Sequence, residues 1–410
     1  MAELNEAFSL ITSTNNQVIK KSEDVNNVNH EIIHETNHTN DEKEHEHIDI
    51  VKIPKSYNVS EHFAILINDV SQLLMEKMLT TCCFSSLSII SMLMVIYVGG
   101  SNKTKEEIER FINLNINIEG TIETIHVIMN ILKSHTETVI DISNYILINN
   151  EILTHMFKPF YKLSSQISLI SGFDSNNVNN MLGSINKLVS SKSYNLLQNP
   201  LSYDDLNNRT NIMLLGTSCI DIQLSCEFDK EHTKNRSFTK LNGEVLKIPM
   251  MLSNARDLFY HECSYFQMVE IPLVEQEFVF GIFLPKKGHE NYIHFNPFDV
   301  YDKLVKKNIV LYIPKFMQKT KFKLVSLLKL FGINEIFDSR TNALNKLTNI
   351  DDIMINDVIH ETYINISENK NAKNRAIKKQ YTIFRANSAF QYYVYNVPLG
   401  LVLYRGIYNG

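Results

Sequence analysis

Residues 87–98 read LSIISMLMVIYV, an almost uninterrupted apolar run that few folds can accommodate. A helix that spans a bilayer needs about 20 apolar residues, so this run is too short for a membrane span. A helix that is apolar on every side must instead be surrounded by other parts of the protein. The chain has 410 residues, of which 44% are hydrophobic, and this is enough to build such a core. We therefore expect a globular fold packed around this helix.

Residues 1–55 differ in composition from the rest of the chain. They are rich in Asn, Glu and His and contain 11 acidic residues against 5 lysines, a net charge of −6. Such a segment buries too little apolar surface to order itself, which predicts a flexible tail. No Gly/Ser/Pro-rich linker divides residues 56–410, so we expect them to form one large domain.

Within this domain, helical patterns come first and most strand patterns follow. Residues 63–78 have helical apolar spacing, and Thr104 to Ile112 predicts a second helix, with Thr104 and Glu107 as a capping box. Residues 268–288 and 308–316 are rich in β-branched and aromatic residues bounded by Pro and Gly, as strands are. This order predicts an α+β fold.

The sequence lacks the glycine-rich and nucleophile motifs of common enzyme classes. Residues 30–34, His-Glu-Ile-Ile-His, match the HExxH pattern of zinc proteases, but they lie in the polar tail, where no packed cleft surrounds them. A solvated tail is favoured, with adventitious metal binding as the alternative. That alternative would use His30, His34, His38, His45 and His47. We expect no enzymatic activity, no cofactor and no metal site.

The five cysteines are odd in number and lack CxxC spacing, which predicts reduced and mostly buried thiols. The net charge of −5 gives no overall bias toward nucleic acid or anionic membranes. No basic region followed by an apolar stretch begins the sequence, so we expect a cytoplasmic monomer, with non-classical export left open.

Several segments, in a fixed order, resemble one protein family. In residues 82–108, Phe84, Ser85, Leu87, Ser88 and Ile89 match the family signature at a buried helix. The other matching segments are FDKEHTKNRSFTKLNGEVLKIPMM (228–251), IPKF (313–316), LLKLFGINEIFD (327–338), VIHETYINISE (358–368), FRANSAF (384–390) and VPLGLVLYRGIYN (397–409). Together they resemble the serpins, a family of serine protease inhibitors. The Asn, Ile and Lys content and the short loop described below are similar to virus-encoded serpins of the poxvirus type.

The resemblance implies three β-sheets with eight or nine helices, and a large sheet that can accept the exposed reactive loop as an extra strand. In inhibitory serpins, the protease that cleaves this loop is held as an acyl-enzyme and dragged across the molecule when the loop inserts. The resemblance also implies that Ser85, Ser88 and His360 form a polar cluster beneath the opening part of the sheet. Gly216 stands where the family has the Asn of this cluster, so one hydrogen-bond partner is expected to be absent. Leu224 stands where the family has a Trp. Both departures indicate relaxed selection on sheet opening.

Residues 368–384 align with the reactive loop and begin at Glu368, the acidic residue that the family conserves. Inhibitory members continue with small residues, which fit into a sheet. This chain carries basic residues on both faces of the segment, and only 15 residues separate Glu368 from Phe384. The basic residues are Lys370, Lys373, Arg375, Lys378 and Lys379. Insertion would bury at least two unpaired cations at several kcal/mol each, against about 0.5–1.5 kcal/mol per backbone hydrogen bond.

We therefore predict a non-inhibitory serpin that acts as a binding protein. The alternative is a suicide-substrate inhibitor of a trypsin-like serine or cysteine protease, with Arg375 or Lys378 at the cleavage site. Including Arg385, residues 369–385 carry six cations and no acid, which would suit an acidic protein or a glycan. A loop that is merely solvated, or that pairs with the acidic tail, is the competing interpretation. Aromatic residues do not interleave the cations, so specific nucleic-acid binding is not expected.

Overall fold

The computed structural model describes residues 61–113, 117–174, 177–207, 209–368 and 381–410. The predicted tail at residues 1–55 and the loop residues 369–380 lie outside this part of the chain. Helices are concentrated before residue 193, and strands dominate the remainder, as the α+β prediction requires. The α-helices described are α2 (Glu61–Met75), α3 (Ser86–Gly99), α4 (Asn102–Ile112), α5 (Ile118–Ser134), α6 (Asn150–Thr154), α7 (Lys158–Ser164), α8 (Val178–Lys192) and α9 (Val325–Leu330). No helix in these ranges is long and apolar enough to cross a membrane.

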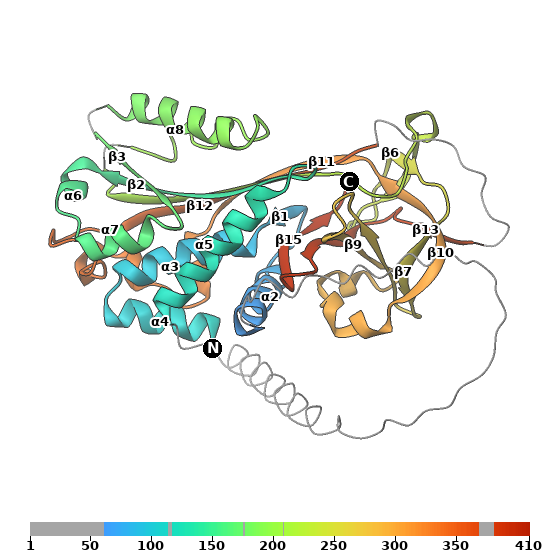
Figure 1. Cartoon of the computed structure of the whole chain (residues 1–410), viewed down its shortest axis with the longest axis horizontal. Coiled ribbons are helices and arrows are strands. Elements are labelled where there is room, and N and C mark those ends of the chain that lie inside the picture. Colours follow the sequence, from blue (N-terminus) through green and yellow to red (C-terminus); the bar gives the residue numbers. More distant parts are fainter. Residues whose placement is uncertain (1–60, 114–116, 175–176, 208, 369–380) are drawn as a thin grey trace, which may run out of the picture. The chain divides into compact units, whose positions relative to one another are not determined.

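The strands of a five-stranded sheet run roughly horizontally in Figure 1. Its strands, in spatial order, are β11 (Phe316–Lys323), β12 (Ile355–Ile366), β4 (Ile212–Ile222), β2 (Val139–Asn149) and β3 (Leu169–Phe173). Helix α8 covers one face of this sheet, and α3 and α5 lie against the other (Figure 1). Because both faces are covered, the central strands β4 and β12 are buried along most of their length, although β12 carries polar residues such as His360 and Glu361.

The remaining strands form one continuous hydrogen-bonded path, except β13, which pairs with β10 as a branch. They are β1 (Cys82–Phe84), β5 (Lys234–Thr239), β6 (Val245–Leu252), β7 (Arg256–Glu262), β8 (Phe266–Pro272), β9 (Phe278–Pro285), β10 (Val305–Pro314), β13 (Thr382–Arg385), β14 (Phe390–Asn396) and β15 (Leu401–Tyr408). The first half of β10 pairs with β7 and its second half pairs with β6. The path is therefore two sheets joined at β10, which confirms the expected total of three.

The apolar run at residues 87–98 lies in α3, as predicted. Every residue of α3 except Val98 is buried. The helix contacts α2, α4, α5 and α7 as well as β2, β4 and β15, so other parts of the protein surround it except near Val98. The predicted strands are confirmed too: residues 268–288 contain β9 and most of β8, and residues 308–316 contain the end of β10 and the start of β11. All five cysteines are free thiols, and Cys263 alone among them is not fully buried.

The predicted capping box at Thr104 is wrong. The N-cap of α4 is Ser101, whose hydroxyl accepts a hydrogen bond from the Thr104 backbone N–H at 3.1 Å. Glu107 turns away from its own helix, and its carboxylate accepts the backbone N–H groups of Asn334 and Glu335. The carboxylate thus holds a distant segment of chain against α4, which a local sequence pattern cannot reveal.

Candidate functional site

The centre of the five-stranded sheet is the seam between β12 and β4, two parallel neighbours. Their pairing runs without interruption from Asp357 opposite Met213 to Ile366 opposite Ile222. A strand inserted here would run antiparallel to both neighbours. The seam is closed along its length, so insertion would have to break this whole ladder of hydrogen bonds.

The predicted polar cluster lies beneath this seam, at the start of α3. The Ser85 backbone N–H donates to Nε2 of His360 at 3.0 Å, and all three predicted residues, Ser85, Ser88 and His360, are fully buried. Nearby, the Thr362 hydroxyl donates to the carbonyl of Cys83 at 2.6 Å. These bonds tie β12 to the strand and helix below it.

The expectation that this cluster lacks an amide partner is wrong for Ser88. The Ser88 hydroxyl donates to Oδ1 of Asn144 at 2.9 Å, and Asn144 lies on β2, directly opposite Gly216 in the sheet register. A Cβ atom at Gly216 would lie 2.5 Å from the Ser88 hydroxyl and 2.8 Å from Met92. Glycine therefore lets α3 approach β4 without displacing these two side chains, and the amide comes from Asn144 on the neighbouring strand β2. Sequence reasoning missed Asn144 because only the register places it there.

The electrostatic setting keeps His360 neutral. Burial lowers its pKa to about 3, and the Gly216 backbone opposes this shift only in part. As a neutral ring, His360 can accept the Ser85 N–H, which an imidazolium could not do. Protonation would therefore break the link between α3 and β12.

The N-terminal stem of the predicted reactive loop is fixed by Glu368. Its carboxylate contacts Nζ of Lys315 at 2.7 Å and accepts the Thr233 hydroxyl at 2.8 Å. Burial opposes ionisation of Glu368, but these partners outweigh it and hold its pKa below the usual value. The predicted loop residues Lys370, Lys373, Arg375, Lys378 and Lys379 lie outside the described residues.

The C-terminal stem of the loop is strand β13. It pairs in parallel with β10, where Phe384 is fully buried and lies edge-on to Tyr260. Arg385 is exposed and stacks over the ring of Tyr312, with its guanidinium 4.7 Å from the ring centroid. Both ends of the loop are thus held in place, the first by the side-chain contacts of Glu368 and the second by strand pairing.

The chain between α8 and β4, described at residues 193–207 and 209–211, contacts the edge strand of this sheet, β11, and we call it the strap. Nζ of Lys321 lies 2.6 Å and Nζ of Lys323 lies 2.9 Å from the Asp205 carboxylate. Nζ of Lys319 donates to the carbonyl of Gln198 at 3.2 Å. Burial alone would raise the pKa of Asp205, but the two lysines outweigh it and hold the pKa well below its usual value. We call the contact of Asp205 with Lys321 and Lys323 the clasp.

The clasp spans the seam. The strap enters β4 at Ile212, whereas the lysines lie on β11, on the far side of β12. An additional strand between β12 and β4 would move β11 outward by about 4.8 Å, the spacing of neighbouring strands. The clasp must therefore break, or the strap must shift, before the sheet can accept another strand.

Comparisons with known proteins agree on one family. A family model described as "Serpin (serine protease inhibitor)" matches residues 69–409. The uncharacterized serpin-like protein R700 of Acanthamoeba polyphaga mimivirus is 22% identical over 351 residues, which cover 80% of this chain and 84% of that protein. Human antithrombin-III is 20% identical over 346 residues, or 78% of this chain and 75% of its own length. The crystal structure of native protease nexin-1 with heparin aligns with a TM-score of 0.74 at 18% identity, covering 85% of this chain and 97% of that one.

The buried His360 predicts an acid-dependent stability. Its pKa of about 3 is lower than the 6.5 of an ordinary histidine, so the unfolded chain binds the proton first as the pH falls. The free energy of unfolding should decrease from pH 6.5 toward pH 3, by up to about 1.4 kcal/mol per pH unit from this group. Urea denaturation at a series of pH values measures this slope. His360→Gln, which keeps an acceptor for Ser85 but does not titrate, should flatten it, and the exposed His62→Gln should not. An unchanged slope in His360→Gln would contradict this account.

The clasp predicts a second effect on stability. Asp205→Asn should lower the free energy of unfolding by about 1–2 kcal/mol, toward the low end for hydrogen bonds to charged groups because the lysines are partly exposed. Urea denaturation at pH 7 is the measurement. Asp204→Asn changes an exposed neighbour and serves as the matched control. Equal effects of the two substitutions would show that the clasp does not stabilise the fold.

Proposed function

The chain belongs to the serpin family, and on that premise we propose that it is a non-inhibitory member that acts by binding a protein partner. Inhibition by a serpin requires the reactive loop to enter the large sheet. The observation that carries the proposal is that the seam is buried on both faces, where the positively charged side chains of the loop would be unfavourable.

One face of the seam packs against α3, and the other lies beneath α8. Toward α3 it presents His360 and Ser218, both fully buried. Toward α8 it presents Ile359 and Leu215, which share an apolar cluster with Ile185 of that helix. An inserted strand would therefore have two buried faces and no solvated side along the middle of the sheet.

The loop sequence does not suit such a site in any register. Alternate residues of a strand point to opposite faces. Lys370 would share one face with Ala372 and Asn374, while Lys373 and Arg375 would share the other. Each cation buried without a partner costs several kcal/mol, more than the gain from the backbone hydrogen bond of the same residue. A shift by one residue exchanges the faces, but because both faces are buried, both sets of cations remain buried.

A specific observation favours the second candidate, a protease inhibitor. The large sheet has five strands, and β12 and β4 on either side of the seam are parallel, so separating them would create a site for a sixth strand antiparallel to both. In that case the loop would act as bait for a trypsin-like protease, with cleavage after Arg375 or Lys378.

Incubation with trypsin-like proteases distinguishes the two functions. We expect the loop to be cleaved without an SDS-stable covalent complex, and the cleaved protein to melt at nearly the same temperature as the intact protein. Mass spectrometry locates the cut, and differential scanning calorimetry compares the two forms. Asp205→Asn, which opens the clasp, should not change this outcome, because the charge of the loop remains. A covalent complex, or a large rise in melting temperature after cleavage, would establish the inhibitory function.

The chemistry of the loop also predicts the kind of partner. Six cations in residues 369–385, on a chain with a net charge of −5, would attract an acidic protein or a sulfated glycan. Binding to an acidic protein or to immobilised heparin should weaken as salt is raised and should fall strongly in the double variant Lys378→Glu and Lys379→Glu. Lys286→Glu and Lys287→Glu provide a control with the same charge change at another pair of adjacent lysines. Equal binding by the loop variant and the native protein would exclude the loop as the contact.

A further inference from the structure

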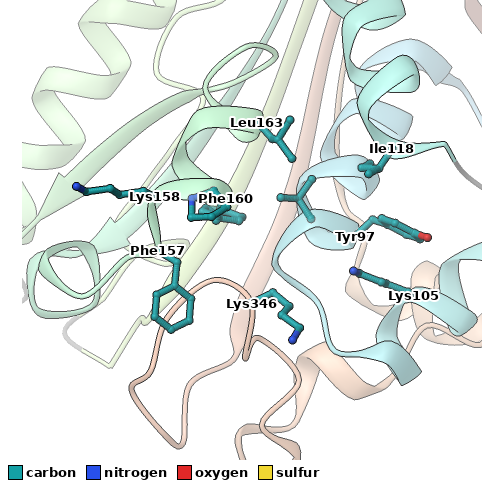
Figure 2. A pocket seen from close by; sticks show the side chains of 10 residues that line it. Tyr97, Lys105, Ile118, Phe157, Lys158, Phe160, Leu163 and Lys346 are labelled. Carbon is teal, nitrogen blue, oxygen red and sulfur yellow. The ribbon is translucent and has the colours of Figure 1, made fainter.

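A surface cavity of about 610 Å³ opens between the end of α3, helix α4 and helix α7 (Figure 2). Its wall is apolar and includes Val98, Ile118, Phe160 and Leu163. This volume falls within the range of roughly 300–1,000 Å³ that is usual for small-molecule sites. The cavity is separate from the loop stems and from the seam.

Backbone hydrogen bonds hold the walls of the cavity together. The Lys346 N–H donates to the carbonyl of Gly99 at the end of α3, and the Phe157 N–H donates to the carbonyl of Leu347 just before α7. A Cβ atom at Gly99 would lie 3.0 Å from the ring of Phe160, so the glycine lets this ring pack closely against α3. The cavity is thus formed before any ligand arrives, and binding need not order its walls.

The charges at the cavity have one sign. Lys105, Lys158 and Lys346 are among its lining residues, and no Asp or Glu is. None of these lysines forms an ion pair with another residue in the described ranges, although Nζ of Lys105 lies over the ring of Tyr97. In Figure 2, Lys105 and Lys346 extend near the same side of the cavity, whereas the ammonium of Lys158 points away from it. The Tyr97 hydroxyl donates to Glu109, so that carboxylate is already engaged.

We propose that this cavity binds a single-chain anionic amphiphile, with a carboxylate or phosphate head between Lys105 and Lys346 and its chain against Phe160 and Leu163. The apolar wall favours a ligand with a hydrocarbon body over a purely polar anion. The two ammonium groups favour a negative head over a neutral one, since no carboxylate among the described lining residues compensates them. This binding is independent of the partner that the loop recruits.

The test compares three ligands of one chain length on the full chain: decanoate and decyl phosphate below their critical micelle concentrations, and decanol below its solubility limit. Isothermal titration calorimetry should show saturable one-to-one binding of at least one of the two anions. Decanol should bind roughly tenfold more weakly or worse, because it lacks the charge that the lysines attract. The preferred head group distinguishes a fatty acid from a phosphate ester as the source of the ligand. Equal binding of decanol, or no saturable binding of either anion, would overturn the proposal.

Charge reversal locates the site. Lys105→Glu and Lys346→Glu should each weaken binding of the anion roughly tenfold, because an attraction at the rim becomes a repulsion. Lys103→Glu makes the same change at an exposed position on α4 outside the cavity and should leave binding unchanged. An unchanged melting temperature verifies that each variant is folded. If Lys103→Glu weakens binding as much as Lys105→Glu, the attraction is a general surface effect and the cavity is not the site.

Discussion

The close approach of α3 to β4 at Gly216 sets the geometry of the five-stranded sheet. Helix α3 is apolar on all sides and must be covered, and the glycine lets its first turn come within contact distance of the strand. Once the helix is there, its polar N-terminal residues need partners inside the protein. His360 and Asn144, directly opposite Gly216 on the two flanking strands, supply them. The packing that buries α3 is therefore the same packing that holds β12 and β4 together at the seam.

The same arrangement explains why the charge of the loop matters. A seam that was buried on one face only could accept a strand with cations on its solvated side. Here α3 lies against one face and α8 against the other, so alternation offers no register in which a basic strand avoids burial. The clasp adds a second barrier, since the strap that follows α8 is bound to the edge strand across the seam. Removing the clasp lowers the cost of widening the sheet but leaves the cost of burying the loop unchanged.

Sequence patterns predicted the features that depend on composition and order. The buried helix, the α+β class, the three sheets and the serpin resemblance follow from apolar periodicity and from motifs in fixed succession. The failures concern contacts between distant residues. Glu107 forms no capping box with Thr104 because its carboxylate is bound to residues 334 and 335. Asn144 supplies the expected amide because β2 lies next to β4. The clasp went unpredicted for the same reason: nothing local links Asp205 to lysines more than 100 residues away.

The lysines fall into two groups, those paired with a buried carboxylate, which stabilise the fold, and those without such a partner, which can bind a ligand. On β11, Lys319 contacts the buried carboxylate of Glu361, and Lys321 and Lys323 contact that of Asp205. The charge of a cation paired in this way is neutralised, and displacing the cation would leave a buried carboxylate unpaired. Lys105 and Lys346 line an apolar cavity and have no ion pair in the described part of the chain, so their charge is available to a ligand. The net charge of the protein is negative, so a site with net positive charge arises only where no carboxylate lies near the lysines. This cavity meets that condition, because none of its lining residues is acidic.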